Sequence, residues 1–115
     1  MTRAETKRLI NKYFKWWMHW LGLGYQTIKL VYVDYWEGDL DCDALCESSW
    51  RYVESTITFN LKNLQTFSEK EIEAVVVHEF MHVFLNEMRA KGIDHEERVA
   101  SMLQKAFMWV KGASK

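Results

Sequence analysis

Three polar residues in the most apolar part of the chain have the types and the spacing to do chemistry together. The segment Glu73–Met88 reads EAVVVHEFMHVFLNEM and carries His78, Glu79 and His82 among valine, phenylalanine, methionine and leucine. Burying two imidazoles and a carboxylate among such neighbours is costly unless each polar group has a partner. The sequence therefore predicts that a partner for these side chains exists, and the spacing indicates its chemical nature.

The spacing of the two histidines suits a metal ion. On a helix, residues four apart such as His78 and His82 project about 40° apart and one turn along the axis. Both imidazoles can then reach one ion at roughly 2.0–2.1 Å and occupy two corners of a tetrahedron. Glu79 points about 100° away from His78, toward a water rather than the ion. HEFMH is thus an HExxH sequence, with Glu79 as candidate general base and later acid.

The surroundings of the motif favour this interpretation over a purely structural one. Two histidines could instead form hydrogen bonds within a core. The helix, however, is apolar almost all round, and such a helix should be buried. The side expected to face away from the histidines carries Val76, Val77, Phe80, Met81, Phe84 and Met88. A divalent cation replaces the hydration that buried imidazoles would lose.

A hydrolytic zinc site usually has three protein ligands and a water, so the sequence must supply a third ligand. A chain reversal at Gly92 would bring the segment DHEERVAS back beside the first helix. The candidates in it are Asp94, His95, Glu96 and Glu97. The last helix is expected to carry an apolar stripe of Val99, Ala100, Leu103, Ala106, Phe107 and Val110. Glu96 projects closer to the centre of this stripe and Glu97 lies at its margin, so geometry alone leaves both open.

With these residues the chain resembles a minimal gluzincin, the glutamate-liganded branch of the HExxH zinc metallopeptidases. It is most similar to the very short members called minigluzincins, including phage and prokaryotic ones. In that branch the third ligand lies on a later helix, in the order Glu, any residue, an apolar residue, then Ala or Ser. Glu97-Arg98-Val99-Ala100 has this order, whereas Ser101 stands where the branch commonly has an acid or amide. The resemblance implies Glu97 as third ligand, with Glu96 as the alternative.

The resemblance also implies an activity, a substrate and supporting groups. It implies a Zn²⁺-dependent peptidase acting on peptides or proteins, with an extended substrate added to an edge strand within ALCESSWRYV. Candidate groups that orient the ligands are Asn86 and Glu87. Candidates for stabilising the oxyanion are Tyr35, Tyr52 and His95, between which the sequence does not choose.

The elements that must position these residues are predicted from periodicity and capping. An amphipathic helix is expected over residues 3–21, with an apolar stripe that includes Trp17 and Trp20, and Gly22 ends it. Ser68 and Glu71 form a capping box at the start of the helix that carries HEFMH. The remaining predicted elements are a strand over Thr27–Trp36, one long or two short strands over Ala44–Leu61, the central helix to about Arg89, and a last helix over residues 95–110. In the second strand region Ile57 and Phe59 alternate onto one face.

This order of elements indicates a small α+β, zincin-like domain over residues 1–115, with a two- to three-stranded antiparallel or mixed sheet. With 115 residues, 49% of them hydrophobic, one compact domain is expected. A net charge of −1 argues against a nucleic-acid partner. No signal peptide or membrane span is evident, so we expect a cytoplasmic protein that does not bind membranes. Cys42 and Cys46 are expected to be reduced thiols.

Two other classes of function remain open at this point. The chain could be a catalytically silent zinc-binding module that regulates or binds other proteins. It could also be an interaction protein whose tryptophan-rich first helix docks on a partner or a membrane surface. The oligomeric state and the substrate are not determined by the sequence.

Overall fold

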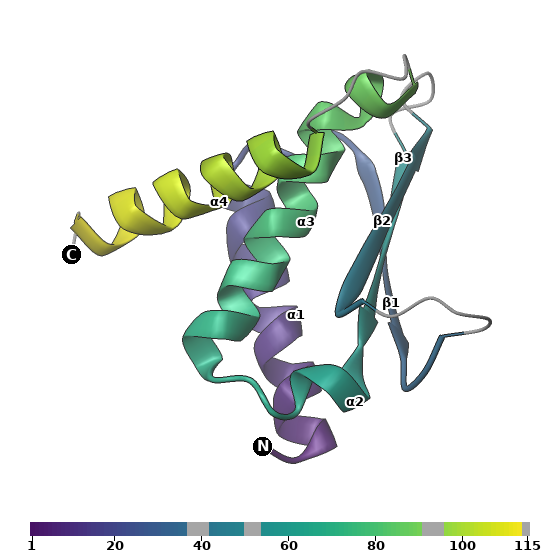
Figure 1. The fold of residues 1–115 in the computed structure, drawn as a ribbon, viewed down its shortest axis with the longest axis vertical. Coiled ribbons are helices and arrows are strands. Elements are labelled where there is room, and N and C mark those ends of the chain that lie inside the picture. The colour runs from purple at the N-terminus through teal and green to yellow at the C-terminus, as the bar shows by residue number, and fades with distance from the viewer. Residues whose placement is uncertain (37–41, 50–53, 91–95, 114–115) are drawn as a thin grey trace.

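The computed structural model describes residues 1–36, 42–49, 54–90 and 96–113, and the side chains of residues 86–90 and 113 lie outside this description. Within these residues the chain forms a small α+β domain, as predicted (Figure 1). The elements in chain order are α1 (Arg3–Trp20), β1 (Thr27–Val33), β2 (Ala44–Ser49), β3 (Glu54–Asn60), α2 (Leu61–Leu64), α3 (Glu69–Ala90) and α4 (Glu96–Ala113).

The sheet is mixed and has the strand order β1-β3-β2. β1 pairs with β3 in parallel, and β2 pairs with β3 antiparallel. The register places Ile57 of β3 between Leu30 and Cys46, and Ile57 and Phe59 are fully buried on one face, as predicted. β1 ends at Val33 rather than at Trp36, because Val33 pairs with the last residue of β3, which is the partner of β1 in the described part of the chain.

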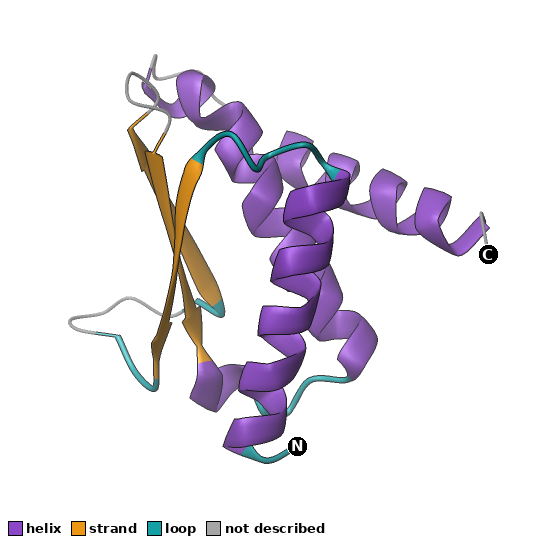
Figure 2. Cartoon of the chain, turned by 180° about the vertical axis from the view of Figure 1, so that it is seen from behind, coloured by secondary structure: helices purple, strands orange, loops and turns teal. Residues whose placement is uncertain are grey.

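The helices lie on one side of the sheet (Figures 1 and 2). α1 and α3 pack next to the sheet, and α4 crosses α3 on its outer side. The interior between these layers is filled by large apolar side chains, as expected for close-packed cores. The largest fully buried side chains include Ile10, Trp17, Leu23, Ile57, Phe59, Leu61, Phe80 and Met81.

α1 follows the predicted pattern except at its end. Thr2 caps the helix by accepting a hydrogen bond from the Glu5 amide, and Gly22 adopts a φ of 71° just after it. A positive φ is a conformation that glycine adopts readily, which explains the stop at this position. Trp20 was predicted on the buried face but is 47% exposed. It lies at the rim, where it contacts Phe107 of α4 edge-on.

α3 begins with the predicted capping box. The Ser68 amide donates to the Glu71 carboxylate at 3.0 Å, and the Glu71 amide donates to the Ser68 hydroxyl at 3.2 Å. The middle of the helix is buried as predicted, but Phe84, which was predicted on the buried side, is 47% exposed. None of the helices in the described residues is long and apolar enough to span a bilayer.

α4 departs from the predicted stripe in its second half. Ala100 is buried and Phe107 packs against the core, as predicted. Ala106 and Val110, which were predicted on the same stripe, are exposed. Figure 1 shows the reason, since α4 crosses α3 and then extends away from the sheet, so its last turns have fewer neighbours.

A buried carboxylate ties the far end of α4 to the other helices. Glu73 of α3 is only 7% exposed, and the Trp17 indole of α1 donates to it at 2.7 Å. The Lys111 ammonium of α4 binds the same carboxylate oxygen. Lys111 also lies 4.3 Å from the ring centre of Trp16 and 5.1 Å from that of Tyr13. Cation–π contacts and the ion pair thus fix α4 at a point distant from its first turn.

Candidate metal centre

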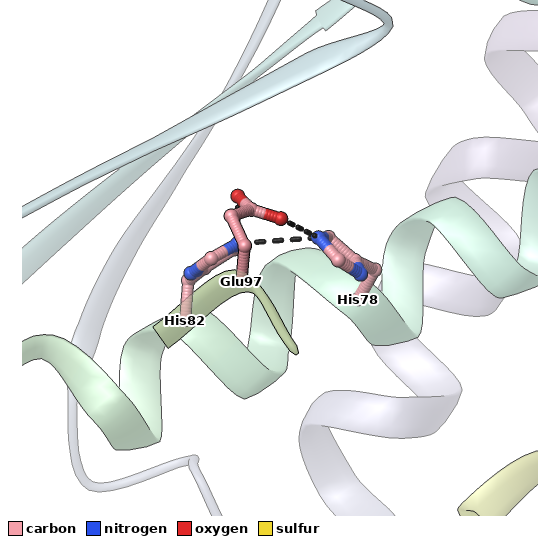
Figure 3. Close-up of side chains that lie close together, drawn as sticks. All are labelled: His78, His82 and Glu97. Atoms are coloured by element: carbon pink, nitrogen blue, oxygen red, sulfur yellow. Dashed lines mark hydrogen bonds and ion pairs between the residues drawn. The ribbon is translucent and has the colours of Figure 1, made fainter. Parts of the chain in front are cut away.

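Two helices bring two imidazoles and one carboxylate together (Figure 3). His78 and His82 lie one turn apart on α3, and Glu97 reaches them from the first turn of α4. The two carboxylate oxygens of Glu97 lie 3.1 Å from His78 Nε2 and 2.9 Å from His82 Nε2. The two Nε2 atoms are 3.2 Å apart. One ligand atom from each of the three residues lies within 4.8 Å of the others, an arrangement that could hold a metal ion.

The separations between these atoms match a tetrahedral zinc site. Two ligands that each lie roughly 2.0–2.1 Å from a tetrahedral ion are about 3.3–3.4 Å from one another. The observed separations of 2.9 to 3.2 Å fall just below this value. A small outward movement of the side chains would therefore admit the ion without a change in the backbone.

A second carboxylate determines which nitrogen of His82 faces this centre. Glu96 accepts a hydrogen bond from His82 Nδ1 at 2.6 Å, and the two side chains are only 10% and 3% exposed. A neutral imidazole carries a single N–H, so donation from Nδ1 leaves Nε2 with a lone pair. That lone pair faces a Glu97 oxygen at 2.9 Å. Two acceptors at this distance need a cation or a shared proton between them.

The electrostatics of His78 favour its neutral form. Burial lowers the pKa of the His78 imidazole below its ordinary value, and His82 lowers this pKa further, while Glu97 and Glu96 act in the opposite direction. Desolvation disfavours the charged ring, which is the expected direction for a buried histidine. The neutral ring is also the form that binds a metal ion.

Glu79, His78 and Glu97 border a cavity of about 320 Å³. Glu79 is 5% exposed and projects from α3 into the wall of this cavity. The opposite wall is the start of β2, an edge strand as predicted. The lining residues are Cys42, Asp43, Ala44, Ala74, Val75, His78, Glu79, Glu97 and Gln104. Cys42 is half-buried at this wall, and Cys46 is buried within β2.

Hydrogen bonds that the sequence did not reveal fix the wall formed by β2. The Cys42 carbonyl accepts from the Trp36 indole at 2.6 Å and from the Asn63 amide at 3.3 Å. The Asp43 carbonyl accepts from the Asn60 backbone amide at 2.8 Å. Asn60 also caps α2, a short helix that was not predicted, although an asparagine before Leu61 is a recognisable N-cap signal. Gln104, which lines the cavity from α4, was also missed.

The other predicted site residues are not brought into the centre within the described part of the chain. Tyr35 is 78% exposed and is not among the residues that line the cavity. Asp94, His95 and Tyr52 lie outside the described residues, as do the side chains of Asn86 and Glu87.

Comparison with known proteins did not identify a family. The sequence matches no protein-family model, and neither a curated protein nor a solved structure matches it. The interpretation of the site therefore depends on its own geometry and on the HExxH sequence.

Proposed function

We propose that this protein is a zinc-dependent peptidase whose metal is held by His78, His82 and Glu97. The observation that carries the proposal is the position of Glu97, whose carboxylate contacts the Nε2 atoms of both histidines from a different helix. Three ligands with one side open to a cavity are typical of catalytic rather than structural zinc sites. The likeness of HEFMH and ERVA to the minimal gluzincins supports the same assignment.

The two adjacent glutamates have different proposed roles. Glu97 is 74% exposed and spans both Nε2 atoms, which suits a ligand. Glu96 is nearly buried and binds the opposite nitrogen of His82, which suits a group that orients a ligand. A metal-bound histidine almost always donates its other N–H to an oxygen, and a carboxylate is a common acceptor. The geometry thus favours Glu97 over Glu96 as third ligand.

Glu79 is the proposed acid–base group. Zn²⁺ in such a site acts as a Lewis acid toward the peptide carbonyl and makes water nucleophilic near neutral pH. The Glu79 carboxylate accepts the proton of the attacking water as its oxygen bonds to the carbonyl carbon. Glu79 then gives this proton to the amide nitrogen as the C–N bond breaks, so the products are a carboxylic acid and an amine, which ionise to a carboxylate and an ammonium.

The edge strand supports a peptide as substrate. β2 pairs with β3 on one side only in the described residues, and its first residues form a wall of the cavity beside His78 and Glu79. An extended chain laid along β2 would form main-chain hydrogen bonds and place a peptide bond over the metal centre. The bonds from Trp36 and Asn63 to the Cys42 carbonyl hold this wall in position.

A catalytically silent zinc-binding module is the second candidate, and one observation favours it. Among the described residues that line the cavity, none is a tyrosine, arginine or lysine that could stabilise an oxyanion. The side-chain amide of Gln104 is the neutral N–H donor among them. Removing one oxyanion donor typically costs a factor of about 10²–10³ in rate, so a site without such a donor could bind zinc and turn over very slowly.

The decisive experiment compares zinc content and peptide cleavage in three proteins. We expect one equivalent of zinc by mass spectrometry and cleavage of a mixed peptide library by the wild-type chain. Glu79→Gln should retain zinc and lose cleavage, whereas Glu5→Gln, at an exposed glutamate in the first turn of α1, should retain both. Equal cleavage by the wild type and Glu79→Gln would refute the mechanism. Stoichiometric zinc without any cleavage would favour the silent module.

A further inference from the structure

A second cavity continues from the metal centre along the groove between α3 and α4. It has a volume of about 510 Å³ and shares Ala74 and Gln104 with the cavity beside Glu79. Figure 1 shows that α3 and α4 diverge in this direction. The residues that line it are Ser68, Lys70, Glu71, Ala74, Gln104, Lys105, Met108 and Trp109.

Helical periodicity explains why the two cavities form one groove. Glu71, Ala74 and His78 lie on one face of α3, because residues three, four and seven apart align on a helix. Gln104 lies seven residues after Glu97 and therefore on the same face of α4. Seven residues of helix span about 10 Å, which corresponds to roughly three residues of an extended peptide. If the cleaved peptide bond lies at the metal centre, the side chain about three residues along the substrate would therefore reach the second cavity.

The chemistry of the second cavity is apolar and basic. Met108 is partly buried, and Trp109 is 74% exposed although its ring borders a cavity. Lys70 and Lys105 are exposed, and neither forms an ion pair with the residues that the structure describes. The Glu71 carboxylate is the acidic group here, and it accepts the Ser68 amide in the capping box. The exposed indole could contact a large apolar side chain of a ligand, and the two lysines beside it could contact a neighbouring carboxylate.

We propose that this cavity is a specificity subsite that receives an apolar residue followed by an acidic one, about three positions from the cleaved bond. The inference rests on the proposed peptidase function, because it assumes that the adjoining cavity holds the scissile peptide. It names the substrate class: extended peptides that combine an aromatic or large aliphatic residue with a neighbouring glutamate or aspartate. Trp109 and Met108 would contact the apolar side chain, and Lys105 and Lys70 would contact the carboxylate.

The test measures peptide binding separately from turnover. Two blocked octapeptides of alanine and glycine each contain one phenylalanine, followed by glutamate in the first and by lysine in the second. Each is titrated into the full-length Glu79→Gln protein with equimolar zinc, and the indole N–H signals are followed by NMR. The Trp109 signal, assigned from Trp109→Phe, should shift with the glutamate peptide. The glutamate peptide should bind roughly fivefold more tightly, since an exposed charge contact changes affinity by this order.

Matched variants connect the preference to this cavity. Lys105→Glu should abolish or reverse the preference, and Lys15→Glu, an exposed lysine of α1, should not change it. Trp109→Ala should weaken binding of both peptides, and Met102→Ala, which truncates a 64% exposed side chain of α4 outside the cavity, should not. Equal affinities in the parent protein, no binding of either peptide, or an unchanged preference in Lys105→Glu would overturn the proposal.

Failure of the subsite and failure of the peptidase function give different results. If the chain is a peptidase without this subsite, the peptide library is cleaved but acidic residues are not enriched near the cleaved bonds. If the chain is not a peptidase, no peptide is cleaved, while the binding preference and its reversal by Lys105→Glu persist.

Discussion

Replacing Glu96 with glutamine tests the assignment of the two adjacent glutamates. Glu96→Gln preserves the shape of the side chain but removes the charge that accepts the His82 Nδ1–H at 2.6 Å. With 10% and 3% of the two side chains exposed, water screens this interaction weakly. A hydrogen bond to a charged group contributes roughly 1.5–3 kcal/mol, against about 1 kcal/mol for a neutral one. The difference of about 0.5–2 kcal/mol corresponds to a zinc affinity about two- to thirtyfold weaker.

The assay is a competition titration of zinc against a chromophoric chelator at fixed pH, which does not depend on catalysis. Glu97→Ala removes a ligand atom and should weaken zinc binding well beyond the effect of Glu96→Gln. Glu5→Gln, at an exposed position of α1, serves as the control and should bind zinc as the wild type does. If Glu96→Gln weakened zinc binding as much as Glu97→Ala, or more, Glu96 would be the ligand and the reasoning from the two nitrogens of His82 would be wrong.

Three further predictions concern the stability of the scaffold. Lys111→Met should destabilise the fold by about 3 kcal/mol in urea unfolding, because it leaves the buried Glu73 carboxylate without its cation. Adding Glu73→Gln to this variant should recover part of the lost stability, and no recovery would contradict a stabilising ion pair between the two residues. The Tyr13 hydroxyl donates a hydrogen bond to the Glu69 carboxylate and lowers the pKa of Glu69. The contribution of this hydrogen bond to the stability of the fold is therefore present above the unfolded-state pKa of Glu69, and it is lost as pH falls through the folded-state pKa. The difference in unfolding free energy between wild type and Tyr13→Phe should therefore shrink in acid, and a difference independent of pH would argue against this linkage. Ser68→Ala should cost about 1 kcal/mol through loss of the cap of α3, measured by thermal unfolding; an unchanged Tm would show that the cap contributes little.

The features that depend on neighbouring residues were predictable from the sequence. The capping box at Ser68 and Glu71, the buried middle of α3 and the alternation of Ile57 and Phe59 each follow from periodicity within a few residues. The close approach of His78 to His82 likewise needs only helical geometry. These predictions succeeded because local backbone geometry determines them.

The features that depend on packing between distant segments were not predictable. Alternation identifies strands, but it does not specify that β1 pairs with β3 in parallel while β2 takes the outer position. The divergence of α4 from α3 exposes Val110, although its periodicity places it on the apolar stripe. The different positions of Glu96 and Glu97 depend on the rotation of α4 about its axis, which is set by contacts with α3 rather than by the sequence around the two residues.

The position of β2 at the margin of the sheet also affects how copies of the protein behave at high concentration. Within the described residues β2 pairs with β3 alone, so its outer edge can pair with an extended chain, including β2 of a second copy. Glu47 in the middle of β2 is exposed, so two copies aligned there would bring like charges together. Neutralising Glu47 would therefore promote self-association. A dimer formed in this way would compete with a bound peptide for the same edge of the sheet.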